Sequence, residues 1–251
     1  TDPNEWDYYD LLRAGVTWYK KESVGRVGLR GKNYSGTFLT VIDRAFQLGA
    51  TRGEIPFLSS SPVNNAFLWE HVNARFNVYN TRMFKENWAG MELWQAFGAG
   101  EIYLSVFTQL DCFFTLGTGE NGLNGYLKDP DDVDFALMPM AVSLKKEINP
   151  MFNRNITNNG WFWGIGRESS HKKMAAALII HMTAAANQAL EFDAFGALPK
   201  TCDLLKENND RLYLERWRNR LLQTSARQIR INRQTVLPAL PDMEKLEKTY
   251  L

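Results

Sequence analysis

Short strand-like stretches alternate with helical patterns along most of the chain, and this alternation restricts the fold more than any single motif does. Alternating strands and helices are typical of α/β proteins. Apolar residues with a period of two, or in short runs, lie at 27–29, 102–106, 135–138 and 161–165. Helical patterns lie at 8–23, 38–48, 61–79, 88–97, 110–116, 172–183, 187–195 and 208–224. The sequence therefore predicts an α/β fold that contains more helix than sheet.

Local signals predict where several of these helices begin, end and face. Asn4 is a candidate cap of the first helix, and Ser61 followed by Pro62 is typical of a helix start. Gly49 predicts the end of the helix over 38–48. In the helix that begins at Ser61, a stripe of large apolar side chains is expected to face the core. Its members are Phe67, Leu68, Val72 and Phe76.

Composition excludes some classes of protein. The 251 residues are 45% hydrophobic, which is enough for a full core and argues against disorder. Lys and Arg number 29 against 28 Asp and Glu, so a net charge of +1 gives no global field for nucleic acid or an anionic membrane. No apolar stretch approaches the ~20 residues of a membrane span. Cys112 and Cys202 are either two separate buried thiols or one disulfide.

Motifs for catalysis, metal binding and nucleotide binding are weak. The loop 117–122 fits G-x-G-x-x-G, but no strand leads into it and no helix follows. The histidines His71, His171 and His181 have no second ligand at a recognised metal spacing. The arginines of 211–233 alternate with acidic residues in the first part of that range, which favours a salt-bridged helix over a nucleic-acid site. We therefore expect a binding protein without metal or cofactor, and not an enzyme.

Four collinear segments carry a family resemblance. The run 159–167 contains Asn-Gly-Trp-Phe-Trp-Gly and precedes an alanine-rich helix, which a Gly-Ala-Leu-Pro turn at 196–199 follows. Upstream, 94–102 combines a helix, a Gly-Glu pair and a strand, and 135–139 is a strand that ends in proline. In this order the segments resemble the extracellular solute-binding proteins of ABC importers, in the carbohydrate-binding, maltose-binding-protein-like cluster.

The resemblance implies a type II periplasmic-binding-protein-like fold. Residues 1–87 and 140–251 would form the C-terminal lobe, and 88–139 would cross back to an N-terminal lobe that has no counterpart in this sequence. The implied function is binding of a small polar solute, a sugar or oligosaccharide, for delivery to ABC permease subunits. The implied location is periplasmic or extracellular, with or without a lipid or membrane anchor. The alternative is a ligand-sensing or interaction domain of a larger protein with the same fold.

Sugar sites combine flat aromatic faces with amide and hydroxyl groups. By resemblance, three places that follow strands or begin them face the ligand cleft. They contain Tyr34, then Phe107, Thr108 and Gln109, and finally Gly160 and Trp161. An exposed loop without function is the alternative for Tyr34, and core packing is the alternative for Trp161. Trp163 lies deeper in its expected strand, so we predict that it packs in the core.

Overall fold

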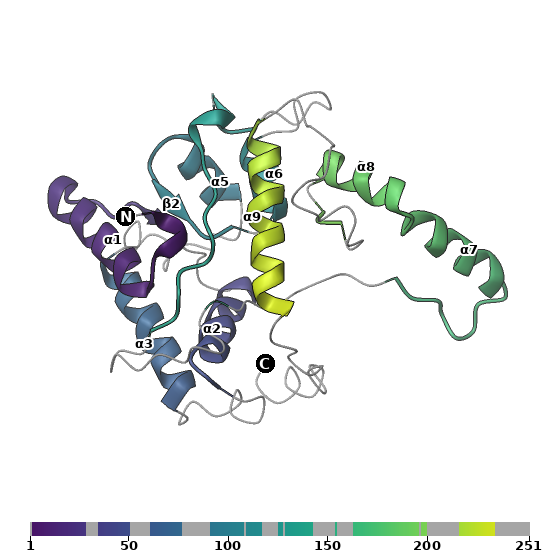
Figure 1. The fold of residues 1–251 in the computed structure, drawn as a ribbon, viewed down its shortest axis with the longest axis horizontal. Helices are drawn as coiled ribbons and strands as arrows, with labels where there is room; N and C mark the ends of the chain where they lie inside the picture. Colours follow the sequence, from purple (N-terminus) through teal and green to yellow (C-terminus); the bar gives the residue numbers. More distant parts are fainter. Residues whose placement is uncertain are drawn as a thin grey trace.

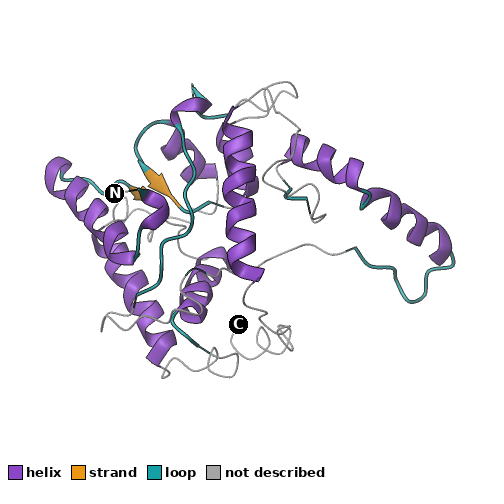
Figure 2. Ribbon diagram, in the orientation of Figure 1, coloured by secondary structure: helices purple, strands orange, loops and turns teal. Residues whose placement is uncertain are grey.

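The structure is a computed structural model of the whole chain. It describes residues 2–28, 35–50, 61–76, 91–107, 109–116, 125–127, 129–142, 154, 163–195, 197–199 and 216–233. Most of these residues are helical, and the two strands among them are two residues each (Figure 2). None of the described helices combines the length and the apolar character that crossing a membrane requires.

A short N-terminal turn leads into the first long helix. The 3-10 helix η1, Pro3–Glu5, is capped by Asp2, and helix α1, Tyr8–Glu22, is capped by Asp7. The carboxylate of Asp7 accepts a hydrogen bond from the Asp10 backbone N–H at 2.9 Å, and the Asp10 carboxylate accepts one from the Asp7 N–H at 3.0 Å. This reciprocal pair is a capping box. The prediction that Asn4 caps α1 is therefore wrong, because the acid three residues further on provides the box.

The two strands are parallel and far apart in the sequence. Strand β1, Val27–Gly28, pairs with β2, Leu104–Ser105, with Val27 opposite Leu104. Among the described residues, three helices lie between them in the chain (Figure 1). They are α2, Ser35–Gln47, α3, Ser61–Phe76, and α5, Met91–Gly98. Parallel strands need such a crossover, since a tight turn cannot join them.

Helices α2 and α3 pack through small side chains. Val41, Ala45, Val63 and Ala66 form one buried cluster, and Gly49 follows α2 with a φ of 93°. The predicted end of α2 at Gly49 is thus confirmed. The predicted apolar stripe of α3 is wrong at Phe67 and Leu68, which are exposed.

The buried face of α3 instead combines its small residues with Trp69. The Trp69 ring packs edge-on against Tyr8 of α1 at 5.6 Å, and its indole N–H donates to the Val142 carbonyl at 2.6 Å. Small side chains let α3 approach α2 closely, and one large ring then closes the remaining space against α1. The number of large apolar residues therefore predicted the wrong buried face for α3.

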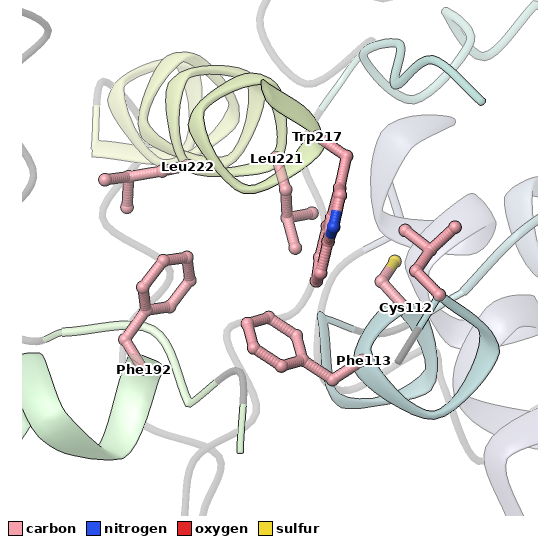
Figure 3. Close-up of a cluster of buried hydrophobic side chains, with 7 residues drawn as sticks. Cys112, Phe113, Phe192, Trp217, Leu221 and Leu222 are labelled. Carbon is pink, nitrogen blue, oxygen red and sulfur yellow. The ribbon is translucent and has the colours of Figure 1, made fainter. Parts of the chain in front are cut away.

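A second core joins three helices from the later part of the chain. Helix α6, Gln109–Leu116, α8, Ala185–Phe195, and α9, Arg216–Arg233, meet around Phe113 (Figure 3). The Phe113 ring lies edge-on to Phe192 at 5.5 Å and to Trp217 at 5.0 Å. The helix predicted over 208–224 continues to 233, because Ala226 and Gln228 extend its buried face.

The segment 133–142 is extended but forms no strand in the part of the chain that the structure describes. Its one backbone bridge is the parallel contact of Met140 with Asp7. The Leu137 N–H donates to the Asn4 side-chain oxygen at 3.1 Å, and the Met138 N–H donates to the Gln228 side-chain oxygen at 3.1 Å. The predicted strand over 135–138 is therefore wrong, since side chains take the place of a neighbouring strand.

Helix α7, Lys172–Met182, extends away from the rest of the molecule and continues end to end into α8 (Figure 1). The residues before it, 163–170, contain no strand, and Trp163 is 60% exposed. The prediction that Trp163 packs in the core is wrong, because no strand in the described part of the chain covers this stretch.

The described residues form mainly packed helices, together with a short pair of parallel strands. Within 88–139, β2 pairs with β1, and α6 packs with α8 and α9. The α/β periplasmic-binding-protein-like class stays a prediction. So does the division into a lobe formed by 1–87 and 140–251 and a crossing segment.

Candidate functional site

The carboxyl ends of β1 and β2 lie at one edge of the parallel pair, and we define this edge as the candidate site. The backbone of Gly28 is opposite Ser105, whose hydroxyl donates to the Gly28 carbonyl at 3.2 Å. After β1 the chain runs to the start of α2 at Ser35, and after β2 it runs to the start of α6 at Gln109. In parallel sheets ligands commonly bind at this edge, where loops and helix N-termini meet.

Gly28 is closely packed at this edge. A β-carbon at Gly28 would lie 2.9 Å from the Leu93 and Ile102 side chains and 3.0 Å from the Ser105 hydroxyl. The strand thus ends against tightly packed neighbours, and the chain that follows starts from a fixed point. This fixed point is what a binding loop requires of its scaffold.

The opposite, amino edge of the pair is covered by side chains. Arg26 precedes β1 and Tyr103 precedes β2, and the Arg26 carbonyl accepts a hydrogen bond from the Tyr103 N–H at 2.8 Å. The Arg26 guanidinium lies 4.8 Å from the centre of the Tyr103 ring and pairs with Glu22 at 2.6 Å. The Trp18 ring meets Tyr103 edge-on at 5.6 Å. These side chains cover the amino edge of the pair.

The structure describes Phe107 and the backbone of Gln109 among the predicted site residues. Phe107 is half-buried, and its ring lies edge-on to Phe97 at 5.5 Å, against the core of α6, α8 and α9. Gln109 is the first residue of α6. The segment that contains Phe107 and Gln109 thus leaves the same edge as the segment that follows β1. Phe107 also serves the core, which its position in a loop did not predict.

The other predicted site residues lie outside the described part of the chain. They are Tyr34, Thr108, Gly160 and Trp161. Trp163, two positions after Trp161, lies on the segment that leads to α7. In Figure 1 that segment is on the other side of α9 from β2. The placement of Trp161 at the carboxyl edge stays a prediction.

A buried pair beside this edge was not predicted from the sequence. The carboxylate of Asp111, in the first turn of α6, accepts a hydrogen bond from the Trp94 indole N–H at 2.9 Å. The Trp94 ring stacks on Phe114 with centres 4.6 Å apart and planes 16° apart. A carboxylate in the first helical turn is stabilised by the helix dipole. Through this bond Asp111 holds α5 against α6.

The pKa shifts of the core groups follow from burial. Burial raises the pKa of the Cys112 thiol well above its ordinary value and that of Tyr8 to about 12. Both groups therefore stay protonated at neutral pH, and a protonated thiol is a poor nucleophile. Cys112 is a free cysteine, and Cys202 lies outside the described residues. Across the described ranges, no three His, Cys, Asp or Glu side chains form a group that could hold a metal ion.

Comparison of the chain with protein-family models, with curated proteins and with solved structures found no match.

Proposed function

We propose that this chain binds a small polar solute, a sugar or oligosaccharide, as part of a receptor for an ABC importer. One observation carries the proposal. The segments that follow β1 and β2, which contain Tyr34 and Phe107 to Gln109, begin at the same edge of a parallel pair. The sequence resemblance selects the same two segments for the ligand cleft.

The chemistry available at this edge suits a sugar. Helices α2 and α6 both begin after it, and the first N–H groups of a helix have no partner within the helix. Such groups, together with the amide of Gln109, can replace the hydrogen bonds that sugar hydroxyls make to water. The ring of Phe107 supplies apolar surface beside them. Apolar contact beside fixed polar groups is the usual composition of a small-molecule site.

The receptor role adds partners and a location to the proposal. The partners are ABC permease subunits, and the location is periplasmic or extracellular. Receptors of this kind enclose the ligand between two lobes. The proposed edge supplies one wall of such a site, so we expect this chain alone to bind with a Kd of about 1 mM, equivalent to about 4 kcal/mol.

Calorimetric titration of the chain with a panel of mono- and oligosaccharides tests the proposal, with amino acids as a second class of polar solute. We expect millimolar binding of at least one saccharide. Gln109→Ala should weaken that binding by about 1 to 2 kcal/mol through the lost hydrogen bonds. Gln95→Ala is the matched control, because Gln95 is an exposed amide on α5. Equal affinities of the two variants, or no saccharide binding by folded protein at tens of millimolar, would contradict the proposal.

The role of Trp161 has its own test. If its ring stacks on the sugar, Trp161→Ala should weaken binding by about 1 to 3 kcal/mol and leave the melting temperature nearly unchanged. Trp163→Ala is the control, since the Trp163 side chain is exposed. A large fall in melting temperature with unchanged affinity would remove Trp161 from the site.

A further inference from the structure

Helices α7 and α8 form a bent rod, residues 172–195, of which only the α8 end is fixed to the core. Phe192 is fully buried among α6 and α9, whereas α7 has no buried residue. The exposed fractions of apolar side chains on the rod are 72% for Met174, 57% for Leu178, 71% for Ile180 and 60% for Leu190. Met174 and Leu178 share one face of α7 and Ile180 lies on the opposite face with Lys173, so the rod exposes apolar side chains on both faces, and no part of the described chain covers them.

Such a surface is unfavourable in water. Isolated helices of fewer than about 12 residues are marginal even with good helix formers, so α7, with 11 residues, needs tertiary contacts. Large exposed apolar patches on soluble proteins mark interaction sites. A partner for this surface is therefore expected on physical grounds.

The joint between the two helices is hollowed. Residues from the end of α7 and from α8 surround a shallow cavity of about 320 Å³. Its lining is formed by His181, Met182, Asn187, Leu190, Glu191 and Ala194. The hollow is mostly apolar and contains one carboxylate, that of Glu191. A long apolar side chain that ends in a cation would match both properties.

The free end of the same rod carries side chains of that kind. Lys172 and Lys173 are exposed in the first turn of α7, next to Met174. The nearby Arg167 is exposed and lies 3.6 Å from the Glu168 carboxylate, so the two lysines give the end its positive charge. One end of the rod is thus basic and apolar, and the hollow near its other end is acidic and apolar.

We propose that the occupant is a second copy of this chain, whose rod packs antiparallel to the first across a two-fold axis near the joint. In this arrangement the Lys173 end of each rod meets the hollow with Glu191 on its partner. A two-fold interface requires a surface that is complementary to itself. A parallel arrangement would place the lysines of the two copies together, and an apolar membrane surface would leave Glu191 without a counter-charge.

The first test measures association of the full chain by sedimentation velocity from about 1 to 200 µM. We expect a concentration-dependent dimer. Ile180→Lys should raise the dissociation constant at least ten-fold, because Ile180 is exposed on the face of α7 that also carries Lys173 and the change places a charge in the apolar contact. Met91→Lys is the matched control, since Met91 is exposed on α5, outside the rod. A wild-type chain that stays monomeric over this range would overturn the proposal, and so would equal effects of the two variants.

The second test is a charge exchange that does not depend on the first variant. Lys173→Glu and Glu191→Lys should each weaken the dimer at least five-fold, and the double exchange should restore it to within about two-fold of wild type. Circular dichroism should show equal helix content in all variants. Failure of the double exchange to restore association would overturn the antiparallel pairing. None of these measurements involves a sugar, so their outcome is independent of the proposed receptor role.

Discussion

Tyr8 shows how one polar atom can be accommodated in an aromatic core. Its ring is buried against Trp69, and its hydroxyl donates to the Gln47 side-chain oxygen at 2.5 Å. The Arg44 guanidinium lies 5.1 Å from the ring centre and favours the ionised phenol, but burial has the larger effect and raises the pKa of Tyr8 to about 12. The core formed by α1, α2 and α3 therefore favours the protonated, neutral form of Tyr8.

This shift gives Tyr8 a measurable contribution to the pH dependence of stability. The pKa is higher in the folded state than the ordinary value of 10.0, so the contribution is fully present below pH 10 and is lost as the pH rises to 12. In Tyr8→Phe the difference from wild type in free energy of unfolding should be constant from pH 7 to 9. Between pH 10 and 12 the wild type should then lose stability relative to Tyr8→Phe by about 1.4 kcal/mol per pH unit. Urea unfolding at these pH values checks this, and a difference that stays flat up to pH 12 would contradict it.

At the scale of elements, α8 is the point where the rod joins the core. Phe192 of α8 packs against Phe113 of α6 in the same cluster as Trp217 and Leu221 of α9 (Figure 3). Ala189 is also buried, but it offers little surface. The attachment of α8 therefore depends chiefly on one ring.

Phe192→Ala should lower the free energy of unfolding by about 3 to 5 kcal/mol, the usual cost of removing a buried phenylalanine. Amide hydrogen exchange should become faster throughout α8, since the helix loses its anchor. Leu190→Ala is the control on the same helix, because Leu190 is exposed and its loss should cost less than about 1 kcal/mol. Equal losses in the two variants would show that Phe192 does not anchor α8.

The predicted elements succeeded where the signal was local. Ser61 with Pro62 and the glycine at 49 predicted helix boundaries, because capping and turn geometry depend on adjacent residues. The strand predicted over 135–138 failed because its partners, Asn4 and Gln228, are side chains from distant parts of the chain. No local pattern carries that information.

The same distinction applies to the candidate site. The position of Phe107 and Gln109 after a strand followed from alternation alone, whereas the pairing of that strand with β1 had no signal in the sequence. The bond between Trp94 and Asp111 could not be predicted, since it depends on how α5 and α6 meet. A tryptophan 17 positions before an aspartate is not a sequence pattern that predicts a contact.

At the scale of the whole molecule, the extended segment 133–142 links the N-terminal turn to α9. It bonds to Asn4 on one side and to Gln228 of α9 on the other. Gln228 also donates to the Arg154 carbonyl at 2.7 Å, and the Arg154 guanidinium donates to the Asn4 carbonyl at 2.5 Å. One buried amide thus links α9 with two distant backbone segments.

Gln228→Ala removes both bonds of this amide and leaves the Met138 N–H without its acceptor. We expect a loss of about 2 to 4 kcal/mol in free energy of unfolding, because buried unsatisfied groups are costly. Gln223→Ala is the matched control, since Gln223 is exposed on the same helix and its loss should change stability by less than about 0.5 kcal/mol. Denaturant unfolding of the two variants checks this. Similar stabilities would contradict the linking role.

The bonds between the N-terminal turn and the segment 133–142 join residues 133 positions apart. During synthesis at roughly 5 to 20 residues per second, the first turn leaves the ribosome about 7 to 27 s before its partner does. Helix α1 can form early, because its capping box is local. Its buried face, with Tyr8, packs against Trp69 of α3, so α3 can cover it early, whereas the backbone of the N-terminal turn has its partner only once Met140 has emerged. The N-terminal turn thus waits while 133 further residues are synthesised before its hydrogen bond with Leu137 can form.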